Sequence, residues 1–174
     1  MIQNKKDDHV KLAQEFHGRN SESHFDKIRF VHKSLSHVDL DQVDTSTSLA
    51  GIDIEYPFFI NAMTGGSSLT GEINRKLAIV ARETGIPIAS GSLSVAMKDP
   101  SLLDSFRVIR EENPDGIVLA NLGAEHSIEN AKKAIDILEA QALQIHLNTP
   151  QELVMPEGDR DFSHWLPSIE YLAK

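Results

Sequence analysis

The sequence contains no cysteine, so neither a disulfide framework nor a thiolate metal site is available to it. No apolar run approaches the roughly 18–20 residues that a membrane span needs, and "MIQNKKDDHV" at the start has no apolar signal core. Basic residues are also few, 17 against 26 acidic ones, which gives a formal net charge of -9. We therefore expect no general affinity for nucleic acid or for a membrane surface, and we expect a cytoplasmic protein.

The composition that remains is that of an ordinary globular protein. The chain has 174 residues, of which 40% are hydrophobic and 25% are charged. This length is enough for one domain with a substantial core, and nothing in the composition indicates disorder.

From residue 58 onward, a short apolar run, a polar turn and an amphipathic helix follow one another repeatedly. The apolar runs cover 58–63, 86–90, 116–121 and 142–148, and successive starts lie 28, 30 and 26 residues apart. Runs without alternation favour parallel strands that are covered on both faces, and the spacing suits one strand plus one crossover helix. Four such units fit either an open doubly wound sheet or half of an eight-unit barrel.

The segments between these runs predict helices over 71–85, 98–114 and 126–142, with a further helix opening at 164–174. Gly85 should end the first helix, Asp99 and Pro100 should begin the second, and Ser127 should cap the third. The residues expected to face the sheet are apolar: Ile73, Leu77, Val80, Ala81, Leu102, Leu103, Phe106, Ile109, Ala131, Ala134, Ile135 and Leu138.

The first 57 residues have a different character. Residues 7–17 predict a short helix capped by Asp7 or Asp8, residues 21–46 are polar and show no period, and 47–57 predict a hairpin with Gly51 in its turn. We therefore divide the chain into an extension over 1–57 and a repeating part over 58–174.

Each of the four predicted strands ends in polar residues, and parallel α/β folds keep their sites at the carboxyl ends of strands. The ends are "NAMTGGSS" with Thr64, "SGSLS" with Ser90, Ser92 and Ser94, "LANLGAEH" with Asn121, and "HLNTPQE". Taken singly, each is also explained as a tight turn, a polar loop or a self-capping asparagine. Their occurrence at all four strand ends favours a site.

The fourth strand end is the richest, because it supplies His146, Asn148, Gln151 and Glu152 within seven positions. Glu152 is the best candidate for a Mg²⁺ ligand, since magnesium is commonly held by one carboxylate together with water and substrate phosphate. Lys5 and Lys6 form a charged cluster at the N-terminus, which is either a solvated tail or, if folded over the strand ends, a diphosphate site.

The order "KKDDH", "NAMTGG", "SGS", "LAN", "HLNTPQE" resembles that of the type 2 isopentenyl-diphosphate isomerases, over essentially all 174 residues. The resemblance implies an FMN-binding TIM barrel that interconverts isopentenyl diphosphate and dimethylallyl diphosphate, with magnesium and a reductant such as NADPH. The implied fold class is α/β, namely the N-terminal half of a TIM (β/α)8 barrel, about four βα units, with a helix and hairpin extension.

The same resemblance implies roles for individual residues. Flavin contacts would come from Ala62, Met63, Thr64, Ser92 and Asn121. Substrate contacts would come from Lys5, Lys6, Ser92, Ser94 and Gln151. Glu152 would bind Mg²⁺, and Gln151 and His146 would lie at the reacting carbons. Two departures stand out: Lys5 occupies a position where the family has arginine, and "SGSLS" lacks the basic residue that many members carry there.

A complete barrel needs roughly 250 residues, so we expect an N-terminal fragment whose own activity is in question. The alternative is a non-catalytic half-barrel that forms a homo-oligomer or needs a complementary second half. A third possibility is an unrelated flavodoxin-like module, which strand order distinguishes, since barrel strands should run 1-2-3-4 in space.

Overall fold

The computed structural model describes residues 5–19, 23–156 and 158–173. The longer helices are α1 (Lys5–Phe16), α2 (Ser68–Thr84), α4 (Asp104–Glu112), α5 (Ile128–Leu138) and α7 (Trp165–Leu172). Short helices are α3 (Ser94–Lys98) and α6 (Thr149–Val154), with 3-10 turns η1 (His24–Lys27), η2 (Leu40–Gln42) and η3 (Pro100–Leu102). The strands are β1 (Thr47–Leu49), β2 (Ile52–Ile54), β3 (Ile88–Ala89), β4 (Val118–Gly123) and β5 (Ala142–His146).

The central element is a parallel sheet in the order β3-β4-β5, so the fold is mixed α/β as expected. Ile88 pairs with Val118, and Leu119 to Gly123 pair with Ala142 to His146. The predicted strand over 58–63 was wrong as a strand, because it forms only an isolated parallel bridge from Ile60 to Ile88. Its main-chain bonds to the β3 segment all involve Ile60, which donates to the Pro87 carbonyl and accepts from the N–H of Ala89. The spatial order Ile60, β3, β4, β5 nevertheless follows the sequence order.

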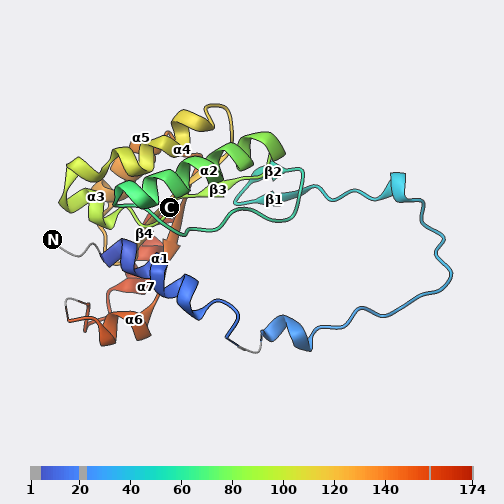
Figure 1. Cartoon of the computed structure of the whole chain (residues 1–174), viewed down its shortest axis with the longest axis horizontal. Helices are drawn as coiled ribbons and strands as arrows, with labels where there is room; N and C mark the ends of the chain where they lie inside the picture. Colours follow the sequence, from blue (N-terminus) through green and yellow to red (C-terminus); the bar gives the residue numbers. More distant parts are fainter. Residues whose placement is uncertain (1–4, 20–22, 157, 174) are drawn as a thin grey trace.

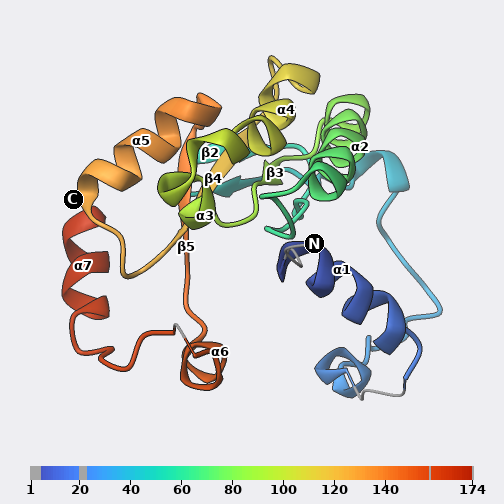
Figure 2. The same cartoon turned by 60° about the vertical axis from the view of Figure 1, so that its left-hand side comes forward.

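Helices α2, α4 and α5 lie side by side along one face of the sheet (Figures 1 and 2). Gly85 ends α2 with φ of 71°, and Ser127 caps α5, as predicted. Helix α2 begins at Ser68 after the cap Ser67, three residues before the predicted start at residue 71. Asp99 caps the turn η3, and α4 starts only at Asp104, so the helix predicted over 98–114 is broken.

The core between helices and sheet is small-residue and aliphatic, with one aromatic ring, Phe106. Its buried members are Ala78, Ala81, Ile88, Leu93, Ala96, Phe106, Ile109, Val118, Ala120, Leu122, Ala134 and Leu138. Val80 was wrongly expected to face inward, because it is 47% exposed. The inward face of α2 also carries the polar residues Thr70 and Asn74, which shift it away from Val80.

The N-terminal part reaches the sheet through α1, which packs beside α2. Because α1 begins at Lys5, Asp7 and Asp8 lie in its first turn and are not its caps, contrary to expectation. The Ser67 hydroxyl donates to Asp7 at 2.5 Å and so ties α1 to the start of α2. Residues 23–46 form a long connection with two short turns, and it leads to the β1-β2 hairpin with Gly51 at φ of 80° (Figure 1).

The end of the sheet opposite the polar strand ends is held by Arg110 of α4. Its guanidinium donates to the carbonyls of Asn113, Pro114 and Gly116, to those of Leu138 and Glu139, and to the side chain of Gln141. One side chain thus joins the segments that lead into β4 and β5. Across the described residues, none of the helices has the length and apolar character of a membrane span.

Candidate functional site

A cavity of about 370 Å³ lies at the carboxyl ends of the strands. It is lined by the turn after Ile60, by the loops after β3 and β5, by the strands β4 and β5 themselves, and by the helices α1 and α6. The lining residues are Lys6, His9, Asn61, Ala62, Met63, Gly91, Ser92, Asn121, Gln144, Ile145, His146, Leu147, Asn148 and Gln151. We call this cavity the strand-end pocket. It gathers polar groups from every parallel segment of the sheet.

One wall of the strand-end pocket is a row of hydrogen-bonded side chains. Asn121, which is 1% exposed, donates from Nδ2 to Gln144 Oε1 at 2.9 Å. Its Oδ1 lies 3.0 Å from Nδ1 of His146. Gln144 in turn donates to Asn61 at 3.0 Å. The register of the sheet explains the row, since Asn121 pairs with Gln144 on the neighbouring strand.

A second row of hydrogen-bonded side chains ends at the pocket with Ser92. The hydroxyls of Ser92 and Ser94 lie 2.7 Å apart, and Ser94 Oγ lies 2.6 Å from Nε2 of His126. Nδ1 of His126 lies 3.1 Å from Nδ2 of Asn130. Asn130 is a donor at this atom, which indicates a neutral ring that carries its proton on Nε2. Ser92 is the member of this row that lines the pocket.

Helix α1 closes the pocket with Lys6 and His9. Burial lowers the pKa of Lys6, because its ammonium group loses hydration. An anionic ligand would stabilise the charged form of the Lys6 ammonium group by electrostatic attraction. Lys5, expected to act with Lys6, begins the same helix but is exposed and is not among the residues that line the pocket.

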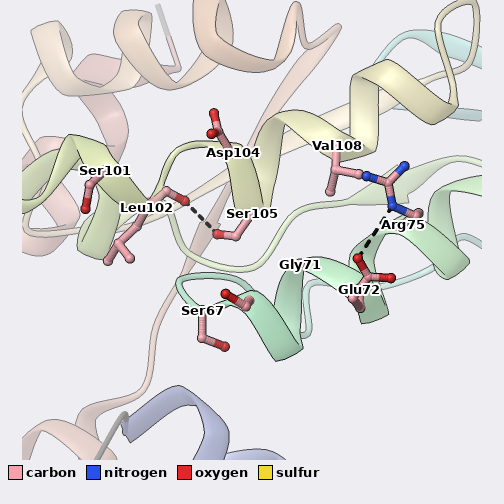
Figure 3. A pocket seen from close by; sticks show the side chains of 10 residues that line it. Ser67, Gly71, Glu72, Arg75, Ser101, Leu102, Asp104, Ser105 and Val108 are labelled. Carbon is pink, nitrogen blue, oxygen red and sulfur yellow. Dashed lines mark hydrogen bonds and ion pairs between the residues drawn. The ribbon is translucent and has the colours of Figure 1, made fainter. Parts of the chain in front are cut away.

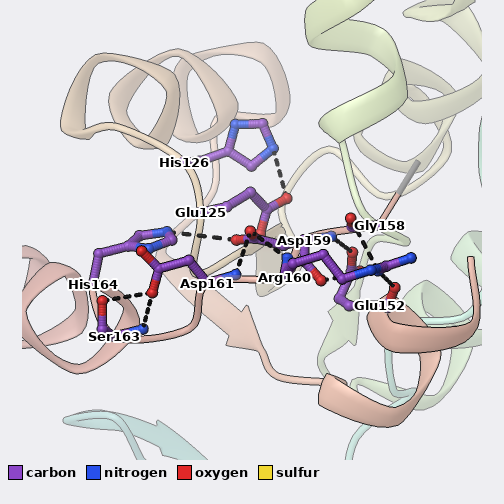
Figure 4. Close-up of polar contacts among 9 residues, drawn as sticks. All are labelled: Glu125, His126, Glu152, Gly158, Asp159, Arg160, Asp161, Ser163 and His164. Carbon is purple, nitrogen blue, oxygen red and sulfur yellow. Dashed lines mark hydrogen bonds and ion pairs between the residues drawn. The ribbon is translucent and has the colours of Figure 1, made fainter. Parts of the chain in front are cut away.

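Gln151 and Glu152 lie on α6, which Asn148 caps by accepting the N–H of Gln151. Gln151 lines the strand-end pocket, but Glu152 does not. Glu152 Oε2 accepts the backbone N–H of Asp159 at 2.9 Å, and Arg160 donates to the Glu152 carbonyl, so residues 158–160 wrap the end of α6 (Figure 4).

The structure therefore brings together Lys6, Ala62, Met63, Ser92, Asn121, His146 and Gln151, all of which were predicted site residues. Thr64, Ser94, Lys5 and Glu152 lie outside the lining. Thr64 is turned away because its hydroxyl donates to Asn74 at 2.8 Å. Its carbonyl oxygen accepts from Asn74 at 3.2 Å and from the N–H of Gly91 at 3.1 Å.

Comparison with known families gives a match to the model described as FMN-dependent dehydrogenase over residues 10–99, which is 90 of the 174 residues. The chain belongs to the FMN-dependent dehydrogenase family. The matched region contains the turn after Ile60 and the loop after β3, which contribute Ala62, Met63 and Ser92 to the pocket.

Within this family, the chain is similar to curated proteins named isopentenyl-diphosphate delta-isomerase. The protein from Streptomyces sp. (strain CL190) is 56% identical over 170 residues, which is 97% of this chain and 47% of the relative. That from Nocardia farcinica is 53% identical over 174 residues, 99% of this chain and 48% of the relative. That from Staphylococcus epidermidis (strain RP62A) is 51% identical over 152 residues, which is 87% of this chain and 44% of the relative. The chain spans about half the length of the curated relatives that it matches.

Four residues near this site were missed from the sequence: His9, Asn61, Gln144 and His126. A signal existed for Gln144, because alternate residues of a strand share a face and Gln144 precedes His146 by two positions. Asn61 lies at the equivalent end of the first apolar run. His126 belongs to the third polar strand end, but no local pattern indicated its contact with Ser94, which joins residues 32 positions apart.

Two other cavities differ in character. One, of about 350 Å³, lies between α2 and α4 and is lined by Ser67, Glu72, Arg75, Asp104 and Ser105 among others (Figure 3). It contains no predicted site residue. The other is an apolar groove of about 600 Å³ between α1 and α2, lined by His9, Val10, Ala13, Gln14, His17, Ile60, Met63, Thr64, Ile73 and Leu77.

The partly buried ring of His126 predicts a pH dependence of stability. Burial lowers the pKa of His126, the carboxylate of Glu125 raises it, and Lys98 and His146 lower it. Because the folded pKa lies below that of the unfolded chain, about 6.5, the unfolded state takes up the proton first as pH falls. His126 therefore costs stability as pH falls through this window, and the cost is absent above it.

We expect His126→Gln to lose less stability than the wild type between about pH 7.5 and about pH 5.5. Urea unfolding at several pH values measures this slope. The difference at the higher pH, where both proteins carry a neutral side chain at position 126, gives the baseline. A wild-type slope no steeper than that of the variant would contradict a lowered pKa.

Proposed function

We propose that this chain forms the N-terminal half, about four βα units, of a TIM barrel that interconverts isopentenyl diphosphate and dimethylallyl diphosphate. The observation that carries the proposal is the strand-end pocket, where segments far apart in the sequence converge in a chain 56% identical to a protein named as this isomerase. The sequential order of Ile60, β3, β4 and β5 is that of consecutive barrel strands and differs from that of a flavodoxin-like module.

The residues present fit one face of FMN. Peptide groups around Ala62 and Met63, the hydroxyl of Ser92 and the polar side chains beyond it offer both donors and acceptors to a heteroaromatic ring. Asn121 would act mainly by holding Gln144 and His146, because both ends of its amide are already bonded. Thr64 would contribute through its backbone, since its side chain bonds Asn74.

The diphosphate would lie toward α1, where Lys6 supplies a cation, with Lys5 at the start of the same helix. Ser92 and Ser94 would donate hydroxyls, and Gln151 would contact the substrate. Glu152 is the residue that would hold Mg²⁺, which would supply charge neutralisation for the diphosphate. It lies beside the pocket and not in its lining, and its Oε2 accepts the backbone N–H of Asp159, so Oε1 is the oxygen that it could offer. Within the described part of the chain no three metal-binding side chains are grouped, so the substrate would have to supply the remaining ligands.

The isomerisation adds a proton to one carbon and removes one from another. When bound and reduced by a donor such as NADPH, FMN would supply the acid–base chemistry at the alkene. Gln151 and His146 would orient the reacting carbons, and the loops would exclude water from them. The protein's other contribution is charge neutralisation, for which Lys6 and Mg²⁺ are the candidates.

A second candidate is a non-catalytic half-barrel that self-associates or binds a complementary half. The apolar groove of about 600 Å³ between α1 and α2 favours it, because large exposed apolar surfaces often mark interaction sites between proteins. The strand β5 also favours it, because β5 pairs with β4 alone and its other edge is open to a further strand.

One measurement separates these candidates: size-exclusion chromatography with light scattering and absorbance after addition of FMN. We expect a flavin spectrum to co-elute with a particle of two 19.3 kDa chains, because each copy would cover the open edges of the other. Isomerase turnover with Mg²⁺ and a reductant is then measured on that fraction. A dimer without flavin would favour the second candidate. A flavin-free monomer would contradict both flavin binding and self-association, and would leave only a half-barrel that needs a complementary half.

A further inference from the structure

The orientation of the Asn61 side chain is fixed by the main chain. The backbone N–H of Ala62 donates to one atom of the Asn61 amide at 2.8 Å. A backbone N–H can only donate, so that atom is the oxygen, Oδ1. This assignment rests on the covalent structure of the peptide and requires no choice between the two ends of the amide.

Every later hydrogen bond in the row then has a defined direction. Gln144 reaches the same Oδ1 at 3.0 Å, so it uses its Nε2 donor there. Its oxygen therefore faces Asn121, which donates from Nδ2 at 2.9 Å. The Asn121 oxygen is thus left to face Nδ1 of His146 at 3.0 Å. An acceptor opposite Nδ1 requires a proton on Nδ1.

We propose that Asn61, Gln144 and Asn121 are positioning residues that hold His146 in its Nδ1–H tautomer, with the lone pair of Nε2 available to a ligand of the strand-end pocket. The preference is opposite to that of a histidine side chain free in water, which carries its proton mainly on Nε2. In this state His146 accepts a hydrogen bond from an N–H or O–H group. We call the four side chains the amide relay.

The surroundings of the relay support a fixed state. Asn121 is 1% exposed, and cross-strand pairing holds it opposite Gln144, so reversing one amide would break the bonds on both sides of it. No hydrogen bond to Nε2 comes from any residue that the structure describes, and His146 lines the pocket. The relay also joins the segment after Ile60 to β4 and β5 through side chains alone.

The relay specifies which ligand group faces His146. A phosphate oxygen without a proton is an acceptor, as is Nε2 of His146, so the two could not form a hydrogen bond. A ring N–H of the flavin meets the requirement. This choice of ligand rests on the proposed function, whereas the tautomer of His146 does not.

The test is ¹⁵N NMR of the histidine rings in the full-length chain at about pH 8, where unprotonated rings reveal their tautomer. The His146 signals are identified by their loss in His146→Asn. We expect a protonated Nδ1 and an unprotonated Nε2. A ring that carries its proton mainly on Nε2 would overturn the proposal with or without flavin.

Three variants test the role of the relay. Gln144→Leu and Asn61→Leu should shift His146 toward the Nε2–H form, while Asn61→Asp should retain the Nδ1–H form because a carboxylate oxygen still accepts both bonds. Gln42→Leu, the same change on the exposed turn η2, is the matched control and should leave the signals unchanged. An unchanged tautomer in Gln144→Leu would show that the relay does not set it.

Flavin titration then separates this inference from the proposed function. If the wild type binds FMN, Gln144→Leu should weaken binding about tenfold, the effect of one hydrogen bond. If the wild type binds FMN and Gln144→Leu binds it equally tightly, a flavin N–H is not the group that His146 contacts. A wild type that holds the Nδ1–H form but binds no FMN would contradict the proposed function and leave the relay intact.

Discussion

Gly91→Ala is expected to destabilise the fold by about 3 kcal/mol or more and to open the strand-end pocket. A Cβ at this position would lie 2.2 Å from the carbonyl oxygen of Thr64 and 2.5 Å from its carbonyl carbon. Both atoms belong to the main chain, so no side-chain rotation relieves the overlap. The turn that carries Ala62 and Met63 would have to move away from the loop that carries Ser92.

Thermal unfolding followed by circular dichroism measures this effect, and the expected loss corresponds to roughly 10 °C for a chain of this length. Gly71→Ala is the matched control, because its nearest neighbour is Ser105 Cα at 3.3 Å and alanine favours the helix α2. We expect it to change stability by no more than about 1 kcal/mol. A Gly91→Ala variant that melts with the wild type would contradict the close approach of the two loops.

Arg110→Ala is expected to cost about 3–4 kcal/mol, because it leaves several partly buried carbonyl oxygens without donors. These oxygens belong to Asn113, Gly116 and Leu138 among others, in the segments that precede β4 and β5. The stability of Arg110→Lys should lie between those of the wild type and Arg110→Ala. Lysine retains the charge but lacks the planar guanidinium that bonds both segments at once.

Equilibrium unfolding in urea gives the comparison. Arg107→Ala is the control on the same helix, because Arg107 is exposed and its ion pair with Asp104 is 3.8 Å long. We expect it to stay within about 0.5 kcal/mol of the wild type. Equal losses in the Arg107 and Arg110 variants would show that the contacts of Arg110 with the two strand-entry segments contribute little.

The features predicted well from the sequence are those governed by local chemistry. Ser127 as a helix cap, Gly85 as a helix end and the apolar runs of β4 and β5 depend on residues close in the chain, and each was confirmed. The first apolar run shows the limit of this reasoning. Its composition is that of a strand, but pairing depends on neighbours, and Ile60 has a ladder partner only at Ile88.

The location of the site could be predicted from the sequence, but most of its individual contacts could not. Polar residues at four strand ends indicated where the pocket lies, and Asn121, His146 and Gln151 do meet there. Sequence could not show that Thr64 turns toward Asn74, or that Glu152 bonds the main chain of Asp159. Those contacts are set by the path of loops that carry no periodic signal.

The strand order described above also bears on how the chain is made. Each parallel segment pairs with the one synthesised just before it, from Ile60 to β3, then β4, then β5. During synthesis on the ribosome, no strand has to wait for a distant partner, and every added strand–helix unit finds its template already in place. The most recently made strand then always forms the growing edge, so a nascent chain can assemble this sheet in the order in which it is translated.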